Sequence, residues 1–527
     1  PEMLHAALDT LYRCVWNYEY NSAANFQLAQ MYVAGNDMRS ARERLEEAVA
    51  YNGRNLQARQ LMATVARHEG NAGCAKEIAE EIIGFDPLNL YALYELKKLG
   101  IDSGFDKIIR NDAEQYLELA IAYHNNGYDE EAVELLEAAD AAVEYPTVKI
   151  WLGYLKNDKT YYDKALALDT RYCNMFRIET IPVLESVMEY APDNYKVYYY
   201  LGNLFYDKQP LKGMEYWKKV ISLKPDFPYA YRNLGFGTWK YLKDPKAAYP
   251  LYLKAVELDG TEAFFLEEID QVAEAAHIDV AERYELLKSH HETCVKRFYP
   301  LAAEVITGIF TGDYDRCVNL LRTCYFPTRE GVANFHDVFV DALLLAGEKK
   351  VSEGEYEEGT ALFKEAFTFP VNHQVFNTQP RPRDAQIYWN LYLAYKKSGA
   401  KSAAAKALKA CAEVDVMKTD YRYFKALALN ELGRKDEALA MFSDLVAAGE
   451  GAVVEDFVNF FGAEGNTGET VESINTRAYY TAGLGYLGMD IMGKGTGEKA
   501  EECFAESVRL KPDNLWSNYF LGKMNLR

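Results

Sequence analysis

Apolar side chains recur along this chain with the spacing that places them on one face of a helix, and small residues recur between them. The clearest stretch covers residues 192–258, where the same unit occurs twice in succession. Leu201 recurs as Leu234 and Pro192 recurs as Pro225, so both steps are 33 residues long. Self-similarity at such a period predicts a chain built by stacking short helical units.

The period and the residue types are typical of tetratricopeptide (TPR) repeats, in which each unit of about 34 residues is a pair of antiparallel helices, A and B. Large apolar residues fill the space between the helices, and small residues let two backbones approach. A proline ends helix B because it lacks an N–H and its ring clashes with the preceding turn. The sequence therefore predicts an all-α fold, a TPR helical-repeat solenoid that forms a right-handed superhelix of antiparallel helix pairs. The positions that carry this prediction are Tyr198, Leu201, Gly202, Phe205, Gly213, Trp217, Val220 and Pro225 in the first copy, and Tyr231, Leu234, Gly235, Thr238, Ala248, Tyr252 and Ala255 in the second.

The strength of the repeat varies along the 527 residues, and this variation predicts four segments. They are 1–190, with TPR-like repeats; 191–326, with the central repeats; 327–448, with repeats interrupted by a loop at 368–383; and 449–527, with the last TPR unit, a glycine-rich loop and a capping helix.

Three elements at the ends of these segments are less regular. We expect one helix over residues 1–20, and an apolar helix over Val453–Phe461 before the glycine-rich loop at 462–470. The final helix carries Trp516 and Tyr519, and we expect it to cap the exposed end of the solenoid.

Composition narrows the classes of partner and compartment. The net charge is −21, whereas a nucleic-acid partner would require a basic stripe. No apolar run approaches the ~18 residues of a membrane helix, so we expect no membrane contact. The eight cysteines include no C-x-x-C pair, which argues against a zinc ribbon and favours reduced thiols in a cytoplasm. The chain begins at Pro1 rather than Met, and we expect it to be the C-terminal piece of a longer protein.

Glycine-rich patterns near the end of the chain could indicate a nucleotide site. Gly483, Gly485 and Gly488 spell G-x-G-x-x-G, but a dinucleotide site would need a strand before them, and the preceding residues have helix character. Lys494 completes most of a phosphate-binding loop, yet Gly495 follows where Ser or Thr would hold magnesium. We therefore favour helix packing for the first pattern and a lengthened turn between helices for the second.

A further cluster, His290, His291 and Cys294, could supply metal ligands at helical spacing. Adjacent histidines point in different directions on a helix, so at most His290 and Cys294 share a face, and we favour a structural role. The sequence predicts no catalytic residue, no cofactor and no metal site. An enzyme is the less favoured interpretation of this chain.

The remaining candidates lie on the concave side of the predicted solenoid, which helix A lines. Asparagine side chains there could make two hydrogen bonds to a peptide backbone, whereas aromatic faces could stack on a sugar ring. The alternative is that the tyrosines only seal adjacent helices. The predicted ligand-binding residues are Tyr199, Asn203, Tyr206, Tyr229, Arg232, Asn233, Trp239, Trp389 and Asn390.

Beyond the general repeat, four stretches carry a closer resemblance: GFDPLNLYALYEL, YYYLGNLFYDKQPLKGMEYWKKV, FPYAYRNLGFGTWKYLKDPKAA and RAYYTAGLGYLG. They resemble the C-terminal TPR half of a family of long bacterial proteins. The first half of that family is a β-rich domain of poorly known function that resembles sugar-binding β-sandwiches. The resemblance implies a bacterial cytoplasmic protein linked to carbohydrate metabolism. It carries over no catalytic residue, because the β-rich domain is absent from this sequence.

Two hypotheses for the function follow. The first is a non-catalytic TPR scaffold that binds a protein or peptide segment, or a β-rich domain of the same protein, on its concave face. The second is the helical accessory half of a carbohydrate-active bacterial protein, in which Tyr199, Trp239 and Trp389 touch sugar.

Overall fold

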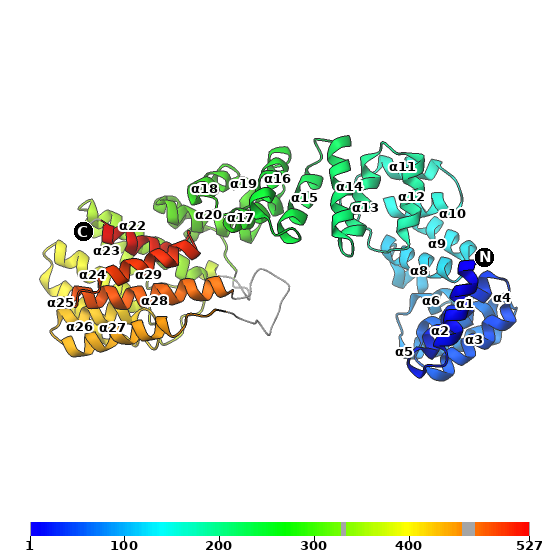
Figure 1. The fold of residues 1–527 in the computed structure, drawn as a ribbon, viewed down its shortest axis with the longest axis horizontal. Coiled ribbons are helices and arrows are strands. Elements are labelled where there is room, and N and C mark those ends of the chain that lie inside the picture. Colours follow the sequence, from blue (N-terminus) through cyan, green and yellow to red (C-terminus); the bar gives the residue numbers. More distant parts are fainter. Residues whose placement is uncertain (1, 328–333, 456–469, 526–527) are drawn as a thin grey trace. The chain divides into compact units, whose positions relative to one another are not determined.

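The computed structural model describes residues 2–327, 334–455 and 470–525, which form thirty α-helices, one 3-10 turn and, within these ranges, no strand (Figure 1). Successive helices pack against each other in pairs along the chain, as TPR repeats do. The predicted all-α TPR fold is confirmed. None of the described helices combines the length and the hydropathy that crossing a lipid bilayer requires.

The chain divides into two compact units, Pro1–Asn233 and Leu234–Arg527, and the boundary falls inside one helix. This division does not test the four segments predicted from the sequence, which stay a prediction. The helices up to that boundary are α1 (Glu2–Cys14), α2 (Tyr18–Ala34), α3 (Met38–Tyr51), α4 (Leu56–His68), α5 (Ala72–Phe85), α6 (Leu90–Lys98), α7 (Phe105–Ile109), α8 (Ala113–Asn125), α9 (Asp129–Ala142), α10 (Pro146–Leu155), α11 (Thr160–Ala167), α12 (Thr180–Tyr190), α13 (Tyr195–Tyr206), α14 (Pro210–Leu223) and the boundary helix α15 (Pro228–Lys240).

The second unit continues the same alternation of helices. Between α23 and α24 it contains only a 3-10 turn, η1 (Val371–His373). Its helices are α16 (Pro245–Leu258), α17 (Ala263–Ala275), α18 (Val280–Ser289), α19 (His291–Cys294), α20 (Phe298–Thr311), α21 (Tyr314–Thr323), α22 (Phe335–Ser352), α23 (Tyr356–Glu365), α24 (Asp384–Lys397), α25 (Lys401–Glu413), α26 (Arg422–Glu431), α27 (Lys435–Glu450), α28 (Val471–Ile491), α29 (Gly497–Leu510) and α30 (Leu515–Asn525).

One contact recurs in both units and explains the small residue of the repeat. A glycine in the first helix of a pair lies directly under an aromatic ring of the second helix, so close that a Cβ atom would stand 2.4–2.8 Å from the ring. No larger residue could occupy these positions without moving the two helices apart. The pairs are Gly153 with Tyr162, Gly202 with Trp217, Gly235 with Tyr252, Gly347 with Phe363 and Gly483 with Phe504.

The G-x-G-x-x-G pattern lies in the middle of α28, and its glycines serve packing as predicted. A Cβ atom on Gly485 would meet the backbone of Phe442 at 2.7 Å, and one on Gly488 would meet the ring of Phe442 at 2.1 Å. The residues between Ile491 and Gly497 form the predicted turn between α28 and α29. No strand precedes the pattern in the part of the chain that the structure describes.

Two predicted helices differ in the structure. The helix expected over residues 1–20 is broken, because α1 ends at Cys14 and Asn17 caps a new helix by accepting from the backbone N–H of Glu19. Residues 453–455, the start of the predicted apolar helix, are not helical. The rest of that helix, and the glycine-rich loop up to residue 469, lie outside the described residues.

A buried ionic network joins α4, α6 and α9 in the first unit. Arg67 donates from Nε to Glu95 at 2.7 Å and from its NH2 group to Glu131 at 2.8 Å. His68 lies 2.7 Å from the same Glu131 oxygen. Burial alone would raise the pKa of Glu131, but the hydrogen bonds from His68 and Arg67 outweigh it and lower that pKa from 4.5 to about 2.

We expect Glu131→Gln to lower the free energy of unfolding by about 3 kcal/mol at pH 7, because the folded protein binds the Glu131 proton less tightly than the unfolded chain does. A lowered pKa stabilises the fold above pH 4.5, and this stabilisation is lost as the pH falls through about 2. The difference from the natural protein should therefore shrink to less than half at about pH 3. Urea denaturation at the two pH values measures it.

Glu134→Gln is the matched control for this prediction, since Glu134 lies on the same helix and forms an exposed pair with Lys98. We expect it to change stability by less than about 0.5 kcal/mol. Equal losses for both variants at both pH values would contradict the role of the buried network.

Candidate functional site

Three predicted groove residues, Asn203, Arg232 and Asn233, meet where α13 lies against the beginning of α15. Asn233 donates from Nδ2 to Asn203 Oδ1 at 3.0 Å, and Trp217 Nε1 donates to the same oxygen at 3.1 Å. Arg232 donates to Asn233 Oδ1 at 3.0 Å, and only 7% of Asn233 is exposed. An amide oxygen accepts two hydrogen bonds, so Asn203 Oδ1 is already satisfied within the protein. These amides tie neighbouring repeats together and offer less to a peptide than their residue types predict.

The predicted tyrosines of this region, Tyr199, Tyr206 and Tyr229, are all half-buried. Tyr199 meets Phe227 edge-on at 5.1 Å between ring centroids, and Tyr229 lies 5.7 Å from the same ring. Tyr206 lies 5.0 Å from Trp217. Burial raises the pKa of Tyr199. The tyrosines therefore contribute to the seal between helices and keep part of each ring at the surface.

Trp239 lies later on α15 and is half-buried. The ammonium group of Lys240 lies 3.4 Å from the centroid of its ring, and burial lowers the pKa of this lysine. This cation–π contact covers one face of the ring. A ligand that stacked on that face would have to displace the lysine.

The other two predicted residues, Trp389 and Asn390, line a cavity of about 710 Å³ inside the second unit. Most of its wall comes from α22, α24, α26 and α28, which are the first helices of successive pairs, and from α30; Tyr314 of α21 and Phe363 of α23 complete it. Asn390 donates from Nδ2 to the backbone oxygen of Gln386 at 3.0 Å. We call the wall formed by the first helices the A-groove; it consists of Leu345, Glu348, Gln386, Trp389, Asn390, Leu393, Tyr423, Phe424, Leu427, Asn430 and Leu487.

The residues that the sequence analysis missed belong to α30, which lies along the A-groove. Trp516 donates from Nε1 to Asp341 Oδ1 at 2.8 Å. Tyr519 donates its hydroxyl to Glu348 at 2.8 Å, and Lys523 donates to Glu348 at 3.0 Å. The matching spacing is the signal that could have found them, since seven residues separate the two carboxylates and seven separate Trp516 from Lys523. The final helix therefore does more than cap the last repeat.

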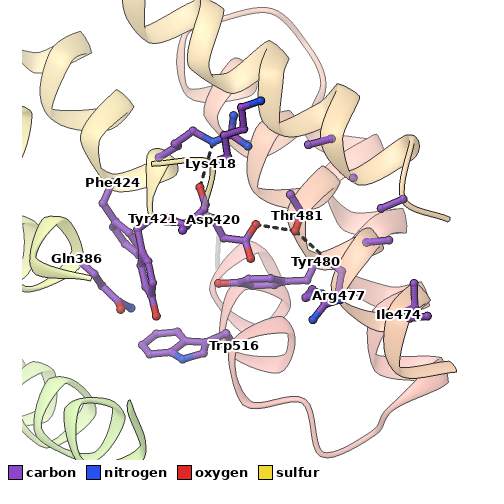
Figure 2. Close-up of a pocket in the computed structure, with 16 residues that line it drawn as sticks. Gln386, Lys418, Asp420, Tyr421, Phe424, Ile474, Arg477, Tyr480, Thr481 and Trp516 are labelled. Carbon is purple, nitrogen blue, oxygen red and sulfur yellow. Dashed lines mark hydrogen bonds between the residues drawn. The ribbon is translucent and has the colours of Figure 1, made fainter. Parts of the chain in front are cut away.

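A second cavity, of about 420 Å³, is also lined by Trp516 (Figure 2). The rings of Tyr421, Tyr480 and Trp516 converge on it, and Asp420 accepts a hydrogen bond from Thr481 at 2.7 Å. Burial raises the pKa of Asp420. Three residues, Gln386, Phe424 and Trp516, line both cavities.

No group of three or more His, Cys, Asp or Glu residues within the described ranges could hold a metal ion. His291 contacts Glu304 at 2.9 Å, and Cys294 is buried with its thiol near the backbone oxygen of Leu287. All eight cysteines are free.

Comparison with known proteins adds little to this picture. No family model matches the chain, and no curated protein matches it. Among solved structures, MamA matches with 18% identity over 38% of this chain and 95% of that chain, at a TM-score of 0.17. The C-terminal part of a TPR repeat-containing protein from Cytophaga hutchinsonii matches with 16% identity over 53% and 98% of the two chains, at 0.23. The APC/C hetero-tetramer Cut9–Hcn1 matches with 12% identity over 98% and 99%, at 0.24.

At TM-scores this low, the similarity says nothing about what this chain binds. The evidence for its fold lies within the chain: the 33-residue step from Leu201 to Leu234, and the glycine under an aromatic ring that recurs in the five helix pairs named above. The chain is a helical-repeat protein of the TPR type.

Proposed function

We propose that this chain is a non-catalytic scaffold that binds a segment of a partner protein on the concave face of its TPR repeats. The observation that carries the proposal is that the A-groove, together with Asp341 on the same helix α22, holds a polypeptide segment, α30, through an indole N–H, a phenol O–H and an ammonium group. A surface that binds one helix through such contacts has the chemistry to bind another. The A-groove includes Trp389 and Asn390, two of the residues predicted for this role.

The partner in this proposal is a separate protein or the β-rich domain of the same bacterial protein. The net charge of −21 supports a partner surface that is basic or neutral, because like charges across an interface repel. The eight free cysteines support a reducing compartment such as the bacterial cytoplasm.

Carbohydrate binding is the second candidate, and the cavity of Figure 2 favours it. Three aromatic rings, the carboxyl group of Asp420 and the amide of Gln386 surround a space of about 420 Å³. Aromatic faces that stack on a sugar ring, together with acceptors for its hydroxyl groups, are typical of a sugar site. A glycan array tests this candidate, with Tyr480→Ala as the variant that should lose the signal and Lys409→Ala, on the outer helix α25, as the control that should keep it.

Site-specific photocrosslinking tests the scaffold. Benzoylphenylalanine replaces Tyr199 or Trp389 on the first helices, and Lys218 or Lys409 on the exposed second helices α14 and α25. We expect covalent protein adducts in a bacterial lysate from position 199 or 389, and none from positions 218 and 409. An excess of untreated chain should suppress the adducts. The same adducts from all four positions, or from the outer pair alone, would exclude binding on the concave face.

A further inference from the structure

We infer that α30 is an internal ligand of the A-groove, and that a helix of the same chemistry from a partner protein displaces it. The partner helix carries a tryptophan. A tyrosine follows it after three positions, a phenylalanine after four and a lysine after seven. This inference rests on the proposed scaffold function and names the chemistry of its partner.

The first argument is that α30 contacts the groove as a docked helix does. Trp516, Tyr519, Phe520 and Lys523 occupy positions i, i+3, i+4 and i+7 of the helix, so they share one face. All four line the same cavity as the A-groove. Phe520 is 7% exposed and lies 5.7 Å from the ring of Tyr423 on α26. Anchors with this spacing are the mark of helix-in-groove recognition.

The second argument is complementary charge. Two carboxylates of α22, Asp341 and Glu348, accept every groove hydrogen bond that Trp516, Tyr519 and Lys523 donate. Burial, with Glu348 next in effect, raises the pKa of Tyr519, so the phenol stays protonated and donates. A partner helix must therefore offer donors and a cation at these positions, and an acidic helix would be repelled.

The third argument is that α30 does not fill the space available to it. Cavities of about 420 and 710 Å³ adjoin it, and Trp516 lines both. Each is large enough for a small ligand, for which about 300 Å³ suffices. Atoms that border a cavity make fewer van der Waals contacts than atoms packed on all sides, so α30 gains less from docking than a helix that filled the same space. A partner with bulkier or additional side chains would gain more.

The fourth argument concerns the tether. α30 is the last described helix, and Lys511 and Asp513 just before it are held by Glu274 and Arg283. Tethering gives α30 an effective concentration on the order of millimolar, so a free helix of equal intrinsic affinity competes poorly. A separate helix should therefore bind the groove measurably only when the docking of α30 is weakened, or when that helix binds the groove better than α30 does.

A labelled peptide tests the inference with the full chain. The probe is a fluorescein-labelled synthetic peptide of residues 511–525, titrated by fluorescence anisotropy. In the chain, Tyr519→Phe with Lys523→Ala removes the contacts to Glu348 and keeps the buried ring of Phe520, so the fold is preserved. We expect the peptide to bind this double variant at least tenfold more tightly than the unchanged chain. Adding Glu348→Gln to the double variant should weaken peptide binding at least fivefold.

Matched controls separate this result from general loosening. Asn525→Ala changes an exposed residue of α30 and should leave peptide affinity as in the unchanged chain. A peptide that itself carries Tyr519→Phe and Lys523→Ala should bind the double variant at least fivefold more weakly than the natural peptide.

Equal peptide affinity for the unchanged chain and the double variant would overturn the inference, as would binding that ignores Glu348→Gln. The photocrosslinking experiment decides the scaffold function separately. Adducts at position 199 or 389 together with failure of the peptide test would leave the scaffold and remove the displacement of α30. Tighter peptide binding to the double variant without any adduct would support the displacement of α30 and remove the concave-face scaffold.

Discussion

Replacing Gly488 by valine is expected to lower the free energy of unfolding by about 3 kcal/mol or more, because overpacking a buried contact forces side chains and backbone apart. A Cβ atom at this position would stand 2.1 Å from the ring of Phe442, which is fully buried. The ring cannot turn away without disturbing the contact between α27 and α28. Thermal and urea unfolding of the purified variant measure the loss, and we expect a large drop in the midpoint of the second unit.

The control for this prediction is Gly522→Ala in α30, where a Cβ atom would meet nothing within 4 Å. Alanine is the better helix former, and we expect a gain of about 0.5–1 kcal/mol. A loss at Gly522 as large as that at Gly488 would mean that helix stability, rather than the close approach of α28 to Phe442, decides the outcome.

The second large effect is expected at Arg383, which joins α24 to α22. Its guanidinium group donates to Asp337 at 3.0 Å and also to Asp341, the carboxylate that accepts from Trp516. Both Arg383 and Asp341 are mostly buried. Removing one partner of a buried pair leaves the other charge without compensation, so we expect Arg383→Met to lower the free energy of unfolding by about 3–5 kcal/mol.

Arg434→Met provides the comparison, since Arg434, just before α27, forms an exposed pair with Glu437 in that helix. We expect a change below about 1 kcal/mol there. A second readout strengthens the test: because Asp341 also binds α30, Arg383→Met should shift the fluorescence of Trp516, measured with the other tryptophans replaced, while Arg434→Met should not. If the two arginine variants lose equal stability, the buried cluster has no special role.

The repeat was predictable from sequence because its determinants are local. Gly202 and Trp217 lie within one unit, and their contact depends only on two helices packing closely. The same logic identified the glycines of α28 as packing residues. Local signals were weaker at the ends, where Asn17 begins a second helix inside the stretch predicted as one.

The candidate site was harder to predict because its decisive contacts are remote in sequence. The bond from Trp516 to Asp341 spans 175 residues, and the one from Arg283 to Asp513 spans 230. The repeat period does not link such positions, and the matching seven-residue spacing on α22 and α30 does not by itself show that the two helices meet, so the final helix was identified only as a cap. The predicted residues Trp389 and Asn390 do line a cavity. Ligand binding by any of the predicted residues stays a prediction. For Asn203 and Asn233, residue type suggested open hydrogen-bonding capacity, and the structure shows these amides bonded to each other.

The contacts of the C-terminal segment with α17, α18 and α22 change how the second unit should unfold. A linear array of repeats can fray from its last unit, because that unit has a neighbour on one side only. Here Lys511, Asp513 and Trp516 bind helices that lie 175–237 residues earlier in the chain, so the last described helices are held in place from a second side. Stretching the chain between the two ends of this unit would load these bonds before any helix pair. The unit should therefore resist small forces and then unfold in one large step, rather than repeat by repeat from its end.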